Sequence, residues 1–235
     1  MIYIGAIIAF VPTLSLMYFI LRKYTYPAVE RPFFSDPTFF ILFSIGLVTG
    51  TILLAAYSYL MGTLMYVIFF SIIECLILVV MMNLKRYRGK SDSVFYGLGL
   101  GLGAGCSMDY GMVYLVGQSS EYLGNSIDFA GYIILAVLGV TLLMQYTAIG
   151  TIIGEGIARH RPMEFMVKAM IINVVFYVTL FVMLLNSDNT MFYLALAAAV
   201  LESSMSLYYT DFVQLPRVVN DVLRMEGIKR DDIPK

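Results

Sequence analysis

Apolar residues are gathered into seven long runs, which short polar connections separate. Each run has about the 20 residues that a helix needs to cross the hydrocarbon core of a bilayer. The runs cover residues 2–21, 38–60, 64–84, 93–116, 129–153, 163–185 and 190–212. This pattern predicts an all-α, polytopic integral membrane protein with seven transmembrane helices.

Composition supports this fold class. The chain has 235 residues, of which 60% are hydrophobic and only 13% are charged, whereas a water-soluble domain carries about twice that charged fraction. A soluble globule is therefore excluded. Only six charged residues fall within the runs, namely Glu74, Asp109, Glu164, Lys168, Glu202 and Asp211.

Basic residues predict the orientation, because they favour the cytoplasmic side of a membrane. All 15 lie after the first, third, fifth and seventh runs or, for Lys168, near the start of the sixth. The opposite connections, 61–63, 117–128 and 186–189, contain none. We therefore expect a multi-pass protein of the cell membrane, with its N-terminus outside and its C-terminus in the cytoplasm.

The chain divides into a seven-helix transmembrane domain, 1–212, and a cytoplasmic tail, 213–235. In the tail, apolar residues alternate with charged ones, which predicts a short amphipathic helix lying on the membrane. These apolar residues are Val213, Leu215, Val218, Val219, Val222 and Leu223. No nucleotide-binding loop or soluble domain is recognisable, so the expected partner is the lipid bilayer and no nucleic acid.

The fourth run has a glycine at every second position from Gly97 to Gly105. A lone strand cannot cross lipid, because its backbone groups would lack hydrogen bonds. In a helix, Gly97, Gly101 and Gly105 form one ridge of small residues, and Gly99 and Gly103 form a second on nearly the opposite face. Neighbouring helices can approach such ridges closely, so this helix should be the central packing element. Tight packing without a ligand is sufficient to explain the glycines.

Three acids lie deep in the predicted membrane domain: Glu74, Asp109 and Glu202. A carboxylate there costs several kcal/mol unless it is paired, hydrated or protonated, and no Lys or Arg lies at the same depth. We expect them to be protonated, to face water or a cation, or to bond polar neighbours such as Asn173, Ser203, Ser204 or Tyr110. Glu155, Glu164 and Asp211 lie nearer the cytoplasmic interface, where water should satisfy them.

Metal and cofactor chemistry has little support. The single histidine, His160, lies in a turn between two arginines, and the two cysteines, Cys75 and Cys106, lie in apolar runs. A zinc site needs three or four converging ligands. We expect no metal, no cofactor and no disulfide.

The segment from Glu74 to Tyr114 carries a resemblance. Glu74 is followed by a basic loop, Tyr96-Gly97, a glycine-rich stretch including Gly101, Asp109-Tyr110 and finally Tyr114. This order resembles the PrsW group of intramembrane proteases, in which a helix with a Glu-Glu-x-x-Lys/Arg motif precedes a glycine-rich helix ending in Glu-Asn and a tyrosine. The wider clan contains the CAAX prenyl endopeptidases and the anterior-pharynx-defective subunit of γ-secretase, which also has seven spans.

The resemblance covers about 40 residues and implies site residues. Glu74 would polarise the attacking water, with Asp109 or Glu202 as the second acid and Tyr110 in place of the motif amide. The groove for a substrate, or for helix packing, would be formed by Gly97, Gly101, Gly105, Tyr110, Gln145 and Asn173.

The sequence departs from the motif of active members. Cys75 or Ile73 stands where the second glutamate belongs, and Leu78 or Ile77 stands where the basic residue belongs. Active members also place histidines in later helices, and the last three runs here contain none. The resemblance therefore implies a catalytically impaired scaffold or substrate-binding protein whose cavity holds a transmembrane helix of a partner. If the protein is active, it implies glutamate-assisted peptide hydrolysis.

Two alternatives stay open at this point. One is a proton- or cation-coupled transporter or channel that uses Glu74, Asp109 and Glu202 as one acidic intramembrane site. The other is a structural membrane subunit whose acids satisfy one another. Both enzyme and transporter hypotheses require these acids to lie close together.

Overall fold

The computed structural model describes residues 2–29, 31–60, 63–122, 127–186 and 189–227. These residues form eight α-helices and one π-helical segment, η1, with no β-strand among them. The elements are α1 (Ile2–Leu21), α2 (Asp36–Leu60), α3 (Leu64–Met82), α4 (Asp92–Tyr122), α5 (Phe129–Ala158), α6 (Pro162–Leu185), α7 (Thr190–Leu207), η1 (Tyr208–Gln214) and α8 (Leu215–Met225).

Six of these helical stretches are long and apolar enough to cross a membrane: α1, α2, α3, α5, α6 and the stretch that begins with α7. The predicted run in α4 is a helix of 31 residues, but it does not reach the hydropathy of the other six. The burial of α4 explains its lower hydropathy. Residues 93–109 of α4 are all buried by the rest of the protein, so this part of the helix does not need apolar side chains that face lipid.

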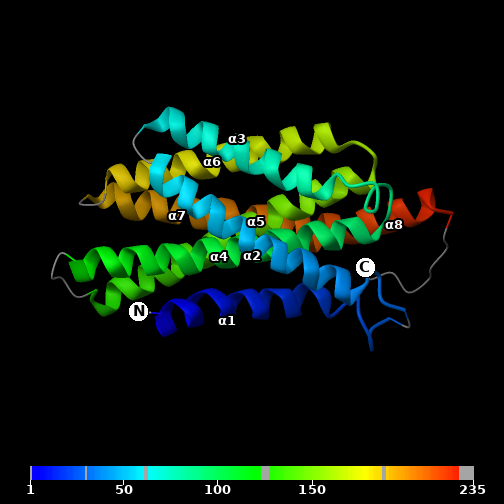
Figure 1. The fold of residues 1–235 in the computed structure, drawn as a ribbon, viewed down its shortest axis with the longest axis horizontal. Coiled ribbons are helices and arrows are strands. Elements are labelled where there is room, and N and C mark those ends of the chain that lie inside the picture. Colours follow the sequence, from blue (N-terminus) through cyan, green and yellow to red (C-terminus); the bar gives the residue numbers. More distant parts are fainter. Residues whose placement is uncertain (1, 30, 61–62, 123–126, 187–188, 228–235) are drawn as a thin grey trace.

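Helix α4 lies at the centre of the bundle, as its glycines predict (Figure 1). Gly97 and Gly101 lie against the backbone of α5, where an added Cβ would be 2.3 Å from a carbonyl oxygen of α5 in each case. Gly103 lies against α2, with its Cβ position 2.1 Å from the Phe43 carbonyl oxygen. The two glycine ridges therefore hold two different neighbouring helices at backbone contact.

The helices run side by side (Figure 1), and the described connections at one end of the bundle carry basic residues that those at the other end lack. We call one end the basic end; it contains the connections 22–35, 83–91 and 159–161 together with α8. Every described basic residue lies there or within two turns of it: Arg22, Lys23, Arg31, Lys85, Arg86, Arg88, Lys90, Arg159, Arg161, Lys168, Arg217 and Arg224. The predicted orientation depends on this arrangement.

The described part of the tail forms the expected amphipathic helix, α8, but its apolar face is covered by protein instead of by the membrane surface. The segment η1 connects α7 to α8 with a change in helical hydrogen bonding. Five residues of the apolar face are buried in the core formed at the basic end, namely Leu215, Val218, Val219, Val222 and Leu223. The helix therefore belongs to the bundle. The rest of the predicted tail, 228–235, lies outside the described residues.

Candidate functional site

Glu74 lies in the middle of α3 and is completely buried. Its Oε2 atom accepts a hydrogen bond of 2.9 Å from Nδ2 of Asn173 on α6. The same amide nitrogen also donates to the backbone carbonyl of Ser71, one turn earlier on α3, at 3.2 Å. The prediction that Asn173 satisfies one of the deep acids is confirmed for Glu74, and a single amide joins α6 to two positions on α3.

Two tyrosines approach the same carboxyl group from α5 and α6. The hydroxyls of Tyr146 and Tyr177 lie 2.9 Å apart, and both side chains interact with Glu74. Neither tyrosine was predicted from the sequence. Tyr177 follows Asn173 by four positions, so both residues lie on one helix face; this spacing was the available signal. Tyr146 is next to Gln145, which the sequence did predict as a site residue.

We call the residues around this carboxyl group the Glu74 cluster: Ser71, Glu74, Gln145, Tyr146, Asn173 and Tyr177. All six are buried. Gln145 belongs to it because its Nε2 donates to the carbonyl of Ile172, the residue before Asn173, at 3.4 Å. The cluster therefore joins α3, α5 and α6 through polar groups in an otherwise apolar interior.

Four oxygen atoms of the cluster have no hydrogen-bond partner among the described residues. They are Ser71 Oγ, Glu74 Oε1, Gln145 Oε1 and Asn173 Oδ1. Buried polar atoms in folded proteins are nearly always paired, because an unpaired one costs about 1–3 kcal/mol. The hydrogen bond between Asn173 and Glu74 places their unpaired oxygens in the same polar cluster, which can accept further partners.

An apolar cavity of about 290 Å³ is lined in part by Tyr177 of this cluster. Its floor contains the buried side chains of Met108, Leu142 and Tyr177, and its rim, away from the basic end, contains the exposed Leu115 and Leu184. Tyr177 thus has its ring in the cavity and its hydroxyl in the Glu74 cluster. The remaining lining residues are Leu54, Tyr57, Ser58, Met112, Val116, Leu135, Leu138, Leu180 and Met183.

The other two predicted acids lie elsewhere. Asp109 of α4 is buried against Gly139 of α5, where its Oδ1 has no hydrogen-bond partner among the described residues. Gly139 and Tyr146, which contact Asp109 and Glu74, are seven positions apart on α5, or about 10 Å along the helix axis. No hydrogen bond or electrostatic interaction joins Asp109 to Glu74 among the described residues.

Glu202 is only half buried on α7, next to the buried Ser203. No hydrogen bond or electrostatic interaction joins it to Glu74 or Asp109 among the described residues. Ser203 bonds the Val200 carbonyl of its own helix, and Ser204 faces the sulfur of Met144. The structure therefore places the three deep acids in three separate environments.

The predicted groove residues fall into two groups. Gln145 and Asn173 belong to the Glu74 cluster. Gly97, Gly101 and Gly105 pack closely against α5, and the Tyr110 ring lies 3.5 Å from the Cβ position of Gly5 on α1. These four residues therefore hold helices together and do not line the cavity.

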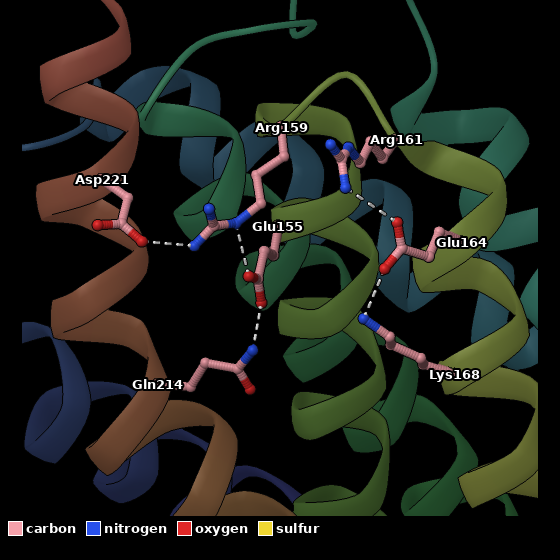
Figure 2. Close-up of polar contacts among 7 residues, drawn as sticks. All are labelled: Glu155, Arg159, Arg161, Glu164, Lys168, Gln214 and Asp221. Atoms are coloured by element: carbon pink, nitrogen blue, oxygen red, sulfur yellow. Dashed lines mark hydrogen bonds and ion pairs between the residues drawn. The ribbon is translucent and has the colours of Figure 1, made fainter.

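A second polar region lies at the basic end, between α5 and α8 (Figure 2). Glu155 is buried and accepts hydrogen bonds from Arg159 Nε and from Gln214 Nε2, both at 2.7 Å. Arg159 also reaches Asp221 on α8 at 3.0 Å. Burial acts to lower the pKa of Arg159, but its bonds to Asp221 and Glu155 raise it above its ordinary value.

This region corrects one expectation. Water was expected to satisfy Glu155 and Asp211, but protein groups do so: Asp211 is buried in η1 and accepts a hydrogen bond of 2.6 Å from Thr151. Glu164 does reach solvent, and it pairs with Lys168 at 2.9 Å and with Arg161 at 3.5 Å (Figure 2). Three contacts here join different elements, namely Arg159 with Asp221, Gln214 with Glu155 and Thr151 with Asp211, whereas the Glu164 pairs are local to the start of α6.

No group of three or more His, Cys, Asp or Glu side chains suited to a metal ion occurs within the described ranges. Cys75 and Cys106 are free and buried. Comparisons of the chain with protein-family models, with curated proteins and with solved structures gave no match. Membership of the PrsW-like clan therefore stays a prediction from the motif.

Proposed function

We propose that this chain is a PrsW-like membrane protein that binds a transmembrane segment of a partner without cleaving it, as a scaffold or substrate-binding protein. The observation that carries the proposal is the apolar cavity that starts at an exposed apolar rim and ends at Tyr177 of the Glu74 cluster. Apolar concave sites with a few polar groups at one end are typical of binding sites.

Binding is favoured over hydrolysis by the surroundings of Glu74. Hydrolysis of a peptide bond needs a base together with an acid that protonates the departing amine. Glu74 is engaged by Asn173, and neither Asp109 nor Glu202 lies beside it. The cluster offers amides and hydroxyls, which can hold a carboxyl group or a backbone carbonyl in place.

The size of the cavity limits its occupant. A helix with its side chains is about 10–12 Å wide, so a cavity of about 290 Å³ is too small for a helix but can hold one or two large apolar side chains. We propose that a partner helix lies across the rim at Leu115, Val116 and Leu184 and inserts such side chains toward Tyr177. Packing of this kind is the main source of helix association in lipid.

Site-specific photocrosslinking in membranes tests this function. A photoreactive amino acid replaces Val116 at the rim or, as a control, Val80 on the exposed side of α3. We expect one discrete protein adduct from position 116 and only lipid adducts from position 80. Lipid adducts alone at both positions would contradict the proposal.

A second variant tests the cavity itself. Leu138→Trp should fill the cavity and abolish the adduct, whereas Leu194→Trp on the exposed side of α7 should leave it unchanged. The captured partner is then incubated with purified wild-type protein and with Glu74→Gln. Cleavage by the wild type that Glu74→Gln abolishes would replace the binding function by a protease function.

We also propose a seven-span topology in the cell membrane, in which α4 crosses the membrane in addition to the six apolar stretches. The N-terminus would lie outside and the basic end in the cytoplasm. The position of α4 between α2 and α5, which both have the composition of spanning helices, supports this. The separation of Glu74, Asp109 and Glu202 weighs against a transporter that uses all three as one acidic site.

A further inference from the structure

We propose that the Glu74 cluster is a binding site for one dehydrated monovalent cation, of the size of Na⁺. The proposal goes beyond binding of a partner helix, because it rests on the oxygen atoms of the cluster and not on the apolar cavity. Its basis is the unpaired Ser71 Oγ, Glu74 Oε1, Gln145 Oε1 and Asn173 Oδ1.

The chemistry of these atoms selects the class of ligand. A carboxylate oxygen, two amide oxygens and a hydroxyl are hard oxygen ligands, which suit cations such as Na⁺, Mg²⁺ and Ca²⁺. The amide nitrogen of Asn173 already donates to Glu74 Oε2 and to the Ser71 carbonyl. This orientation leaves Asn173 Oδ1 free to act as a ligand.

The charge of the site selects a monovalent ion. Glu74 is the only carboxyl group in the cluster, and the described Lys and Arg residues lie at the basic end. A buried carboxylate without a counter-ion is strongly unfavourable, and a single positive charge neutralises it. A divalent ion would leave one uncompensated positive charge in the same interior.

The position of the cluster gives such an ion a structural effect. Its ligands come from α3, α5 and α6, so a bound cation would join three helices at mid-depth. Asn173 Nδ2 bonds Glu74 Oε2 between α6 and α3, and Tyr146 and Tyr177 also interact with Glu74. We therefore expect the cation to stabilise the fold measurably.

Thermal unfolding of the detergent-purified full chain tests the site, with NaCl, KCl or choline chloride at equal ionic strength. The two cysteines are buried and free, so a thiol-reactive dye reports unfolding. At ten times its dissociation constant, Na⁺ should raise Tm by about 3–6 °C over choline. Equal Tm values in all three salts at a mildly alkaline pH would overturn the proposal.

Variants locate the effect. Glu74→Gln and Ser71→Ala should abolish or weaken the Na⁺ response, and Glu202→Gln, which changes an acid outside the cluster, should leave it intact. A full response in both cluster variants would place the ion elsewhere and overturn the proposal.

Equilibrium binding of radioactive ²²Na⁺ to the wild-type chain makes the result independent of how the variants fold. We expect about one saturable ion per chain; no saturable binding would overturn the proposal. This outcome is separate from the crosslinking at position 116, which can succeed in choline whether or not Na⁺ binds.

Discussion

Gly97 of α4 and Gly150 of α5 pack backbone against backbone. A Cβ atom added to either residue would lie 2.3 Å from the carbonyl oxygen of the other. Such a contact is far shorter than van der Waals distance, so the two helices can approach this closely only because both positions lack a side chain. The pair fixes the spacing between α4 and α5 toward the basic end of the bundle.

We predict that Gly150→Ala destabilises the protein by about 1–3 kcal/mol or more, because α4 and α5 must move apart to admit the methyl group. Gly5→Ala is the matched control, because its Cβ would lie at an ordinary contact distance of 3.5 Å from Tyr110 and Val113. Thermal unfolding in detergent measures both variants. An unchanged Tm for Gly150→Ala would mean that this helix contact is looser than described.

The length of the apolar runs was sufficient to predict the helices of the bundle, and alternating glycines were sufficient to predict that α4 packs on two sides. The sequence could not show which surface covers the apolar face of α8. Leu215, Val218 and Val222 have the same spacing whether lipid or protein covers them, and only the folded bundle brings the basic end against them.

The candidate site was predictable in part. A lone acid at mid-depth indicates that polar partners must exist, and Asn173 was among the few residues able to serve. Tyr177 could be selected only by its four-residue spacing from Asn173, a weak signal among 18 tyrosines, so Tyr146 and Tyr177 were missed. Asp109 and Glu74 are separated because they contact different positions of α5. Those contacts depend on how the helices pack against one another, which the apolar pattern of one helix does not determine.

The hydrogen bond between Asn173 and Glu74 predicts a strong energetic coupling. Asn173→Leu should destabilise the protein by about 1–3 kcal/mol, because it removes a hydrogen-bond donor from a buried carboxyl group. Adding Glu74→Met should recover part of this loss, so the double variant should cost at least about 1 kcal/mol less than the sum of the single variants. Unfolding free energies of the four proteins give the coupling, and simple additivity would argue against the bond.

Arg159 forms two ion pairs, and we predict that they contribute unequally to stability. Its bond to the buried Glu155 belongs to a class worth about 1.5–3 kcal/mol, whereas its bond to the half-exposed Asp221 is worth about 1 kcal/mol or less. Arg159→Gln should therefore lower Tm clearly, and Asp221→Asn should have a small effect. Arg224→Gln, an exposed arginine on α8, is the control and should behave as wild type. Equal effects of all three variants would assign no special role to Glu155.

The proposed crossing of α4 predicts that its two ends lie on opposite sides of the membrane. Lys90 precedes this helix and Ser119 lies in its last turn, and both are exposed, so a cysteine at either position can react. The native cysteines are buried and should stay silent. In intact cells, a membrane-impermeant maleimide should label Ser119→Cys and not Lys90→Cys, and permeabilisation should expose both. Labelling of Lys90→Cys alone would reverse the orientation, and labelling of both in intact cells would show that α4 does not cross.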